Sequence, residues 1–165
     1  MTGSSGIERW LAELGLELPL VNPPQGNYLP YKRTGNLVFV AGQGPRRNGQ
    51  LLFKGTVGGD LTLEQGQEAA RLCALNILVQ LRMACDGDLG RVVSMVRLAG
   101  LVRCTAEFED QAKVLNGASD LICEVLGPAG PHARIASGTH ALPSGMAVEI
   151  EAIAEIAEQG ATNPV

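Results

Sequence analysis

The chain has 165 residues, of which 45% are hydrophobic and 18% are charged, a composition that predicts one globular domain and excludes a disordered chain. A net charge of −4 and only 4% aromatic residues argue against nucleic-acid binding, which usually needs a basic face or stacking aromatics. No run reaches the roughly 18 apolar residues of a membrane span, and the first residues do not form a signal peptide, so we expect a cytoplasmic protein without a membrane partner.

The N-terminal region, residues 1–25, is predicted to be a short helix followed by a proline-rich extension. Ser5 and Glu8 have the spacing of a capping box, and apolar residues follow at helical spacing until Gly15. Three prolines then exclude a helix from residues 16–26. The single domain, residues 1–165, is therefore expected to consist of this extension and a core.

The core, residues 26–157, is predicted to place two long helices among several strands. A second capping box begins the first of these helices, which runs from Leu63 to about Cys85, and the second covers 110–126. This order predicts an α+β fold, a mixed sheet with both helices packed on one face. Strands are expected at 37–41, 51–53, 92–102 (with a bulge at Gly100), 134–141 and 146–156.

The last predicted strand alternates, with Glu149, Glu151 and Glu155 on one face and apolar residues on the other. The apolar face should pack on the helices. The acidic face has two interpretations, a solvated surface or a site where a carboxylate meets a partner charge. Because the second face of the sheet also needs cover, we expect another copy of the chain to pack on it.

The cysteines and histidines give no sign of a metal site. The cysteines form no C-x-x-C pair and lie in or beside apolar segments, which predicts buried or half-buried free thiols in a reducing compartment. His132 and His140 do not have the spacing of a metal pair. The four cysteines are Cys73, Cys85, Cys104 and Cys123.

Arg134 is the residue that most suggests binding chemistry. It begins a predicted strand whose other residues are small and neutral, so its guanidinium has room to grip a carboxylate through two N–H groups. The alternative is a salt bridge to a neighbouring Asp or Glu. No phosphate-binding loop and no Gly-x-Ser-x-Gly elbow is present.

Motifs at both ends of the core occur in one order and at fixed separations. They are Gly26-Asn27-Tyr28, Thr34 to Pro45, Ala133-Arg134, Ala141-Leu142-Pro143 and Val148 to Ala154. Together they resemble the Rid family, the YjgF-like proteins that are also labelled endoribonuclease L-PSP proteins. The resemblance covers about residues 26–156. It implies a chorismate-mutase-like fold and a homotrimer with pockets between its subunits.

The same resemblance implies an activity and a set of site residues. The activity is hydrolysis of enamines and imines of the 2-iminobutanoate or 2-iminopropanoate type to a 2-keto acid and ammonia, with no metal or organic cofactor. By resemblance, Arg134 would bind the substrate carboxylate and Glu149 would position or activate the attacking water. Tyr28 and Asn116 would shape the pocket, and Gly42 would offer backbone groups.

Two departures from the family pattern keep other functions open. Ala41 and Ala136 stand where the deaminase branch often has a serine and a cysteine. One alternative is therefore a non-catalytic or regulatory homotrimer whose pocket binds a small carboxylate such as a 2-keto acid. The family label suggests an endoribonuclease as a further alternative, but the acidic charge and the few aromatic residues argue against it.

Overall fold

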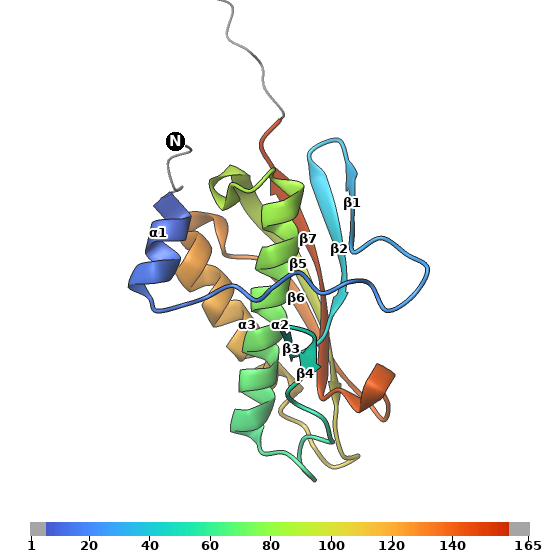
Figure 1. The fold of residues 1–165 in the computed structure, drawn as a ribbon. Coiled ribbons are helices and arrows are strands. Elements are labelled where there is room, and N and C mark those ends of the chain that lie inside the picture. The colour runs from blue at the N-terminus through green and yellow to red at the C-terminus, as the bar shows by residue number, and fades with distance from the viewer. Residues whose placement is uncertain (1–5, 159–165) are drawn as a thin grey trace, which may run out of the picture.

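The computed structural model describes residues 6–158, so the predicted N-cap Ser5 lies outside the described residues. Within this range the chain forms one sheet in the order β1-β2-β7-β5-β6 and a small ribbon of β3 and β4. Helices α2 and α3 cover one face of the sheet (Figure 1). The elements are α1 (Gly6–Glu13), β1 (Tyr31–Thr34), β2 (Leu37–Gln43), β3 (Arg46–Arg47), β4 (Gln50–Leu51), α2 (Leu63–Ala84), β5 (Val92–Arg103), α3 (Gln111–Leu126), β6 (Ala133–Thr139) and β7 (Val148–Ile156).

The sheet is mixed, as predicted. Strand β7 is its centre and pairs antiparallel with both β2 and β5, whereas β6 pairs parallel with β5. The predicted bulge at Gly100 is wrong, because the register of β5 shifts near its beginning, between Val92 and Ser94 and again between Met95 and Arg97. Gly100 pairs regularly, and its missing side chain leaves room for Leu115 of α3.

Helix α2 begins at the predicted capping box. The Thr62 hydroxyl accepts from the Gln65 backbone N–H at 3.2 Å, and the Gln65 side chain accepts from the Thr62 N–H at 2.9 Å. These two bonds satisfy N–H groups that the first turn of a helix leaves without partners. The helix then lies beside α3 on the same face of the sheet, and most of its residues are buried.

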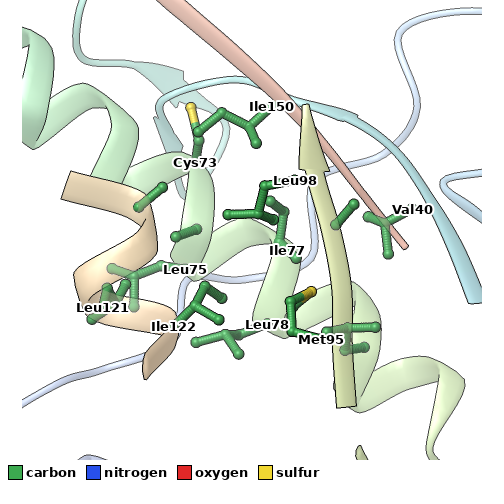
Figure 2. Close-up of a cluster of buried hydrophobic side chains, with 14 of the residues drawn as sticks. Val40, Cys73, Leu75, Ile77, Leu78, Met95, Leu98, Leu121, Ile122 and Ile150 are labelled. Atoms are coloured by element: carbon green, nitrogen blue, oxygen red, sulfur yellow. The ribbon is translucent and has the colours of Figure 1, made fainter. Parts of the chain in front are cut away.

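The hydrophobic core lies between α2, α3 and the inner face of the sheet (Figure 2). Ile77 and Leu78 of α2 are fully buried, with Leu121 and Ile122 from α3 on one side and Leu98 from β5 on the other. Burying one such side chain contributes about 1.5–3 kcal/mol. The core thus holds the two helices at a fixed position over β5, β6 and β7.

The N-terminal helix is present, and it packs against the helix layer. The indole N–H of Trp10 donates to the Glu124 carbonyl of α3 at 2.8 Å, and Leu11 is buried. The proline-rich segment then crosses α2 toward β1 (Figure 1). There the Asn22 side chain donates to the Asn76 side chain of α2 at 2.9 Å.

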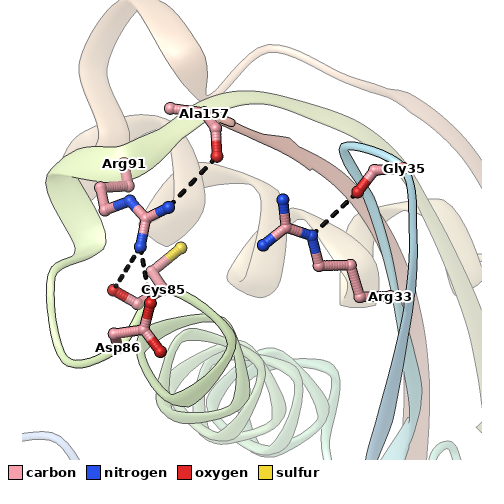
Figure 3. Close-up of polar contacts among 6 residues, drawn as sticks. All are labelled: Arg33, Gly35, Cys85, Asp86, Arg91 and Ala157. Carbon is pink, nitrogen blue, oxygen red and sulfur yellow. Dashed lines mark hydrogen bonds and ion pairs between the residues drawn. The ribbon is translucent and has the colours of Figure 1, made fainter. Parts of the chain in front are cut away.

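Arginine side chains tie the elements together at the end of the molecule where β7 finishes (Figure 3). Arg91 donates to the Asp86 carboxylate at 2.8 Å, to the Cys85 carbonyl at 3.4 Å and to the Ala157 carbonyl at 3.3 Å. These bonds join the turn after α2 to the residue that follows β7. Arg33 donates to the Gly35 carbonyl in the β1–β2 turn.

The prediction of free thiols is confirmed, since Cys73 and Cys85 are buried and Cys104 and Cys123 are half-buried. Burial raises the pKa of the Cys73 thiol well above its ordinary value, and the charge of Glu149 raises this pKa further. The neutral thiol donates to the Val148 carbonyl at 3.6 Å. Because a nucleophilic cysteine must be a thiolate, Cys73 is a structural residue.

The second face of the sheet is uncovered in residues 6–158 (Figure 1), and it carries exposed apolar side chains together with charged ones. Side chains from β2, β5 and β6 stand on it, while Glu149 and Glu151 of β7 lie among them. Helices cover the opposite face, so the predicted arrangement is confirmed. Exposed apolar residues on these strands include Leu37, Phe39, Leu101 and Ile135.

Candidate active site

A cavity of about 450 Å³ lies where the proline-rich segment passes the ends of β2 and β7. Pro23 and Pro24 form one wall, and Tyr28 lines it nearby. Gly42 and Glu149 line it from the sheet. The cavity thus brings together three of the predicted site residues, Tyr28, Gly42 and Glu149.

Glu149 and Gly42 are in direct contact. A side chain at position 42 would place its Cβ 2.5 Å from the Glu149 carboxylate, so the carboxylate occupies the space that the glycine leaves open. A second cavity, of about 430 Å³, lies on the uncovered face of the sheet and shares both residues with the first. Glu149 is therefore accessible from two sides.

The electrostatics of Glu149 suit proton transfer. Burial raises the pKa of this carboxyl above its ordinary value, and the negative charge of Glu151 raises it further. A carboxylate with a raised pKa is a better base, and it can both take and return a proton closer to neutral pH.

Arg134 lies in a different place, against helix α3. Its Nη1 donates to the Asn116 side-chain oxygen at 2.9 Å and to the Ser119 hydroxyl at 3.1 Å, and its Nη2 donates to the Ala112 carbonyl at 3.2 Å. Among residues 6–158, no acidic side chain pairs with it. Within the same range Nε–H and one N–H of Nη2 have no acceptor, so two neighbouring nitrogens can still bind a carboxylate.

Ser119 and His132 extend this network, and neither was predicted as a site residue. His132 Nδ1 lies 2.7 Å from the Gly130 carbonyl, and Nε2 lies 2.9 Å from the Ser119 hydroxyl. A carbonyl can only accept, so Nδ1 carries the proton and Nε2 accepts from Ser119. The Ser119 oxygen then accepts from Arg134. The one available signal was that Asn116 and Ser119 are three apart and share a helix face.

Arg134 and Glu149 stand on opposite faces of the sheet. Arg134 is paired with Leu98, which is buried under the helices, whereas Glu149 is paired with Leu101, which is 42% exposed on the uncovered face. The predicted residues therefore form two groups in one chain. Tyr28, Gly42 and Glu149 share the cavity, while Asn116 and Arg134 are bonded to each other at the edge strand β6.

Comparison with known proteins decides the family. Residues 8–156 match the family described as "YjgF/chorismate mutase-like, putative endoribonuclease". The chain is a YjgF-like protein of the Rid family. Both the resemblance and the chorismate-mutase-like fold expected from it are thus confirmed.

Relatives of this YjgF-like protein match it over nearly its whole length. It is 42% identical to protein TCP17 of Trypanosoma cruzi over 157 residues. The match covers 94% of this chain and 98% of TCP17. A solved structure of a protein of unknown function from Agrobacterium tumefaciens is 45% identical, with a TM-score of 0.86 over 92% of each chain. A Shewanella oneidensis structure with the endoribonuclease label is 37% identical, with a TM-score of 0.88 over 91% of this chain and 99% of that one.

No three or more His, Cys, Asp or Glu side chains of the YjgF-like protein gather into a potential metal site within residues 6–158. In the same range no helix is both long and apolar enough to cross a lipid bilayer.

Proposed function

We propose that the protein is an imine and enamine deaminase that hydrolyses 2-imino acids of the 2-iminobutanoate and 2-iminopropanoate type. The observation that carries this proposal is the presence of two complementary groups in the chain. Glu149 is a carboxylate with a raised pKa at a cavity. Arg134 is a guanidinium held by α3 with donors to spare. The first group suits proton transfer to and from water, and the second suits a substrate carboxylate.

The chemistry needs one water and one base. Glu149 takes a proton from water as the oxygen attacks C2 of the protonated imine, and a carbinolamine forms. Glu149 then gives that proton to the amine nitrogen, which becomes an ammonium group. The C–N bond breaks, ammonia leaves, and Glu149 accepts the hydroxyl proton as the 2-keto acid forms. Imine hydrolysis has a low intrinsic barrier, so orientation of the substrate by Arg134 and of the water by Glu149 suffices.

The assembly we propose for this activity is a homotrimer with pockets between subunits. Within one chain Arg134 and Glu149 lie on opposite faces of the sheet, so a site containing both needs two copies. The exposed apolar side chains on the uncovered face support such packing, since a second copy could bury them. In this arrangement one subunit supplies Arg134 and Asn116, and its neighbour supplies Tyr28, Gly42 and Glu149.

One observation favours a second candidate, a homotrimer that binds a 2-keto acid without turnover. Ala136 alternates with Arg134 along β6 and packs toward the core, so it lies on the same face as Arg134 and offers it no polar group. A pocket with fewer polar groups can still bind a carboxylate. The endoribonuclease alternative has less support, because the chain carries a net charge of −4.

Formation of 2-keto acid tests the proposal. Imines are generated in situ by an amino-acid oxidase, and hydrolysis is followed for the wild type, Arg134→Ala and a control variant, Arg71→Ala. Arg71 lies on α2, lines neither cavity, and forms a 3.9 Å ion pair with Glu124. We expect the wild type and the control to accelerate hydrolysis, and Arg134→Ala to lose roughly 100-fold in kcat/KM.

The other functions predict different outcomes of the same experiment. If the wild type accelerates no imine but binds a 2-keto acid in calorimetry, the deaminase proposal is wrong and the binding function stands. RNA cleavage that persists through further purification and disappears in Arg134→Ala would favour the endoribonuclease.

A further inference from the structure

Arg46 is a second arginine at the candidate site, and neither the family motifs nor the proposed mechanism uses it. It belongs to the short strand β3 and lines the same cavity as Tyr28 and Glu149. It lies where the chain turns from β2 into the β3–β4 ribbon. Arg46 as a whole residue is half-buried, while its guanidinium makes its hydrogen bonds in exposed surroundings.

The backbone of Arg46 is held firmly. Its N–H donates to the Gly44 carbonyl at 2.9 Å, and its carbonyl accepts from the Asn76 side chain at 2.8 Å. Asn76 is buried in α2, also donates to the Gly44 carbonyl at 3.1 Å, and accepts from Asn22 of the proline-rich segment. One buried amide thus fixes the part of the cavity wall that carries Arg46.

The guanidinium itself has weak partners. Nη1 lies 3.3 Å from the Gly49 carbonyl and Nη2 lies 3.5 Å from the Ser144 hydroxyl, both long for charged donors. Among residues 6–158, no carboxylate forms an ion pair with Arg46, although Glu149 lines the same cavity. A cavity-lining guanidinium with unused donors can bind an anion.

From these contacts we infer that Arg46 binds a second acidic group of the substrate, and that the preferred substrates are 2-imino dicarboxylic acids. This inference rests on the proposed function. The carboxylate next to C2 binds Arg134 of the neighbouring subunit, C2 lies beside Glu149, and the distal carboxylate binds Arg46. Ser144, which lines the same wall, can donate its hydroxyl proton to that carboxylate.

The electrostatics favour a distal carboxylate over a phosphate. Arg46 is the one cationic side chain among the described residues that line this cavity, and Glu149 contributes a negative charge to it. A single guanidinium matches the single charge of a carboxylate and its two oxygens. A phosphate monoester carries nearly two charges at neutral pH and would meet stronger repulsion from Glu149.

Substrate selectivity tests the inference. Imines of dicarboxylic amino acids are generated with an oxidase that accepts aspartate and glutamate, and imines of alanine with an oxidase for neutral amino acids. The measured quantity is the ratio of the two kcat/KM values for the wild type, Arg46→Gln and Arg47→Gln. Arg47 is the matched control, because it follows Arg46 in the same two-residue strand but does not line the cavity.

We expect the wild type to prefer the dicarboxylic imine by about tenfold or more, and Arg46→Gln to lower that ratio about tenfold. The ratio for Arg47→Gln should equal that of the wild type. If the wild type hydrolyses both imines and Arg46→Gln keeps the wild-type ratio of kcat/KM values, the role proposed for Arg46 is wrong. The deaminase function would still stand.

Binding separates this inference from a failure of the proposed function. If no imine is hydrolysed, calorimetry compares 2-oxoglutarate, 2-oxobutanoate and inorganic phosphate on the wild type and Arg46→Gln. Tighter binding of 2-oxoglutarate that is lost in Arg46→Gln would support the second acidic site. Equal affinity for the two keto acids, or a preference for phosphate, would overturn it.

Discussion

The pKa of Glu149 sets the pH dependence that we expect of the activity. The carboxylate form accepts the proton from water, so kcat/KM should rise as pH increases through the raised pKa. Because the charge of Glu151 is one cause of that rise, Glu151→Gln should lower the pKa and move the acid limb of the profile to lower pH. The measurement is kcat/KM against pH. Glu155→Gln, on the same face of β7, is the control and should leave the limb in place.

The same residue should limit stability at neutral pH. The folded state raises the pKa of Glu149 above its unfolded value, so the stability associated with this group is present at low pH and is lost as pH rises through the raised pKa. Glu149→Gln should remove this pH-dependent loss of stability, because a glutamine side chain does not titrate. We expect its Tm to exceed that of the wild type at pH 7.5 and to approach it near pH 4. A difference that does not change with pH would contradict the assignment.

Ser119 should affect substrate binding indirectly, by holding the Arg134 guanidinium in place. Ser119→Ala removes one acceptor of the guanidinium and the link to His132, while Asn116 and Ala112 still hold it. The loss of one charge-assisted bond corresponds to about 1.5–3 kcal/mol, so KM should rise roughly tenfold or more with a smaller change in kcat. Asp120→Asn, an exposed change on the same helix, is the control. A fall in kcat with unchanged KM would contradict a positioning role.

At the scale of single residues, the sequence predicts a site residue only where that residue belongs to a recognisable motif. Arg134 and Glu149 were predicted because each belongs to a motif with fixed spacing. Ser119, His132 and Arg46 were not, because their roles depend on contacts between segments that only folding brings together. Nothing in the sequence near Arg46 indicates that the Ser144 turn lies beside it in the folded chain.

Among the elements, the contact between α2 and α3 should be sensitive to small additions. Gly117 of α3 faces the Gln67 carbonyl of α2 so closely that an added Cβ would overlap backbone atoms, which cannot rotate away. Gly117→Ala should therefore force the helices apart and destabilise the protein by about 1–3 kcal/mol. Urea unfolding measures this, with the exposed Lys113→Ala as a control. Unchanged stability would show that the two helices can separate without cost.

The predicted elements were correct where periodicity was strong and incomplete where it was weak. Capping and apolar spacing placed α2 and α3 almost to the residue. Strand β1 was not predicted, because its four residues include Lys32, Arg33 and no apolar run. It exists because β2 provides an edge with which to pair. The bulge was placed at Gly100 because a glycine suggests irregularity, whereas this one accommodates Leu115.

At the scale of the whole molecule, the intersubunit site predicts complementation. Arg134→Ala and Glu149→Gln should each be inactive as pure proteins. When they are unfolded together and refolded, some sites combine the intact Glu149 of one subunit with the intact Arg134 of its neighbour. Random assembly of an equal mixture restores roughly a quarter of the sites. Activity is measured after separation of the trimer fraction. If the mixture stays inactive while trimers form, the two residues do not share a site.

The position of β7 also has a consequence for synthesis. This strand is the centre of the sheet, yet among the elements of residues 6–158 it is the last to be synthesised. Its partner β2 is synthesised much earlier, so Leu37 cannot pair with Glu155 until β7 has been synthesised. Such distant pairing slows folding. Until β7 arrives, β2 and β5 present unpaired edges that invite aggregation, which makes this a chain that benefits from chaperones during translation.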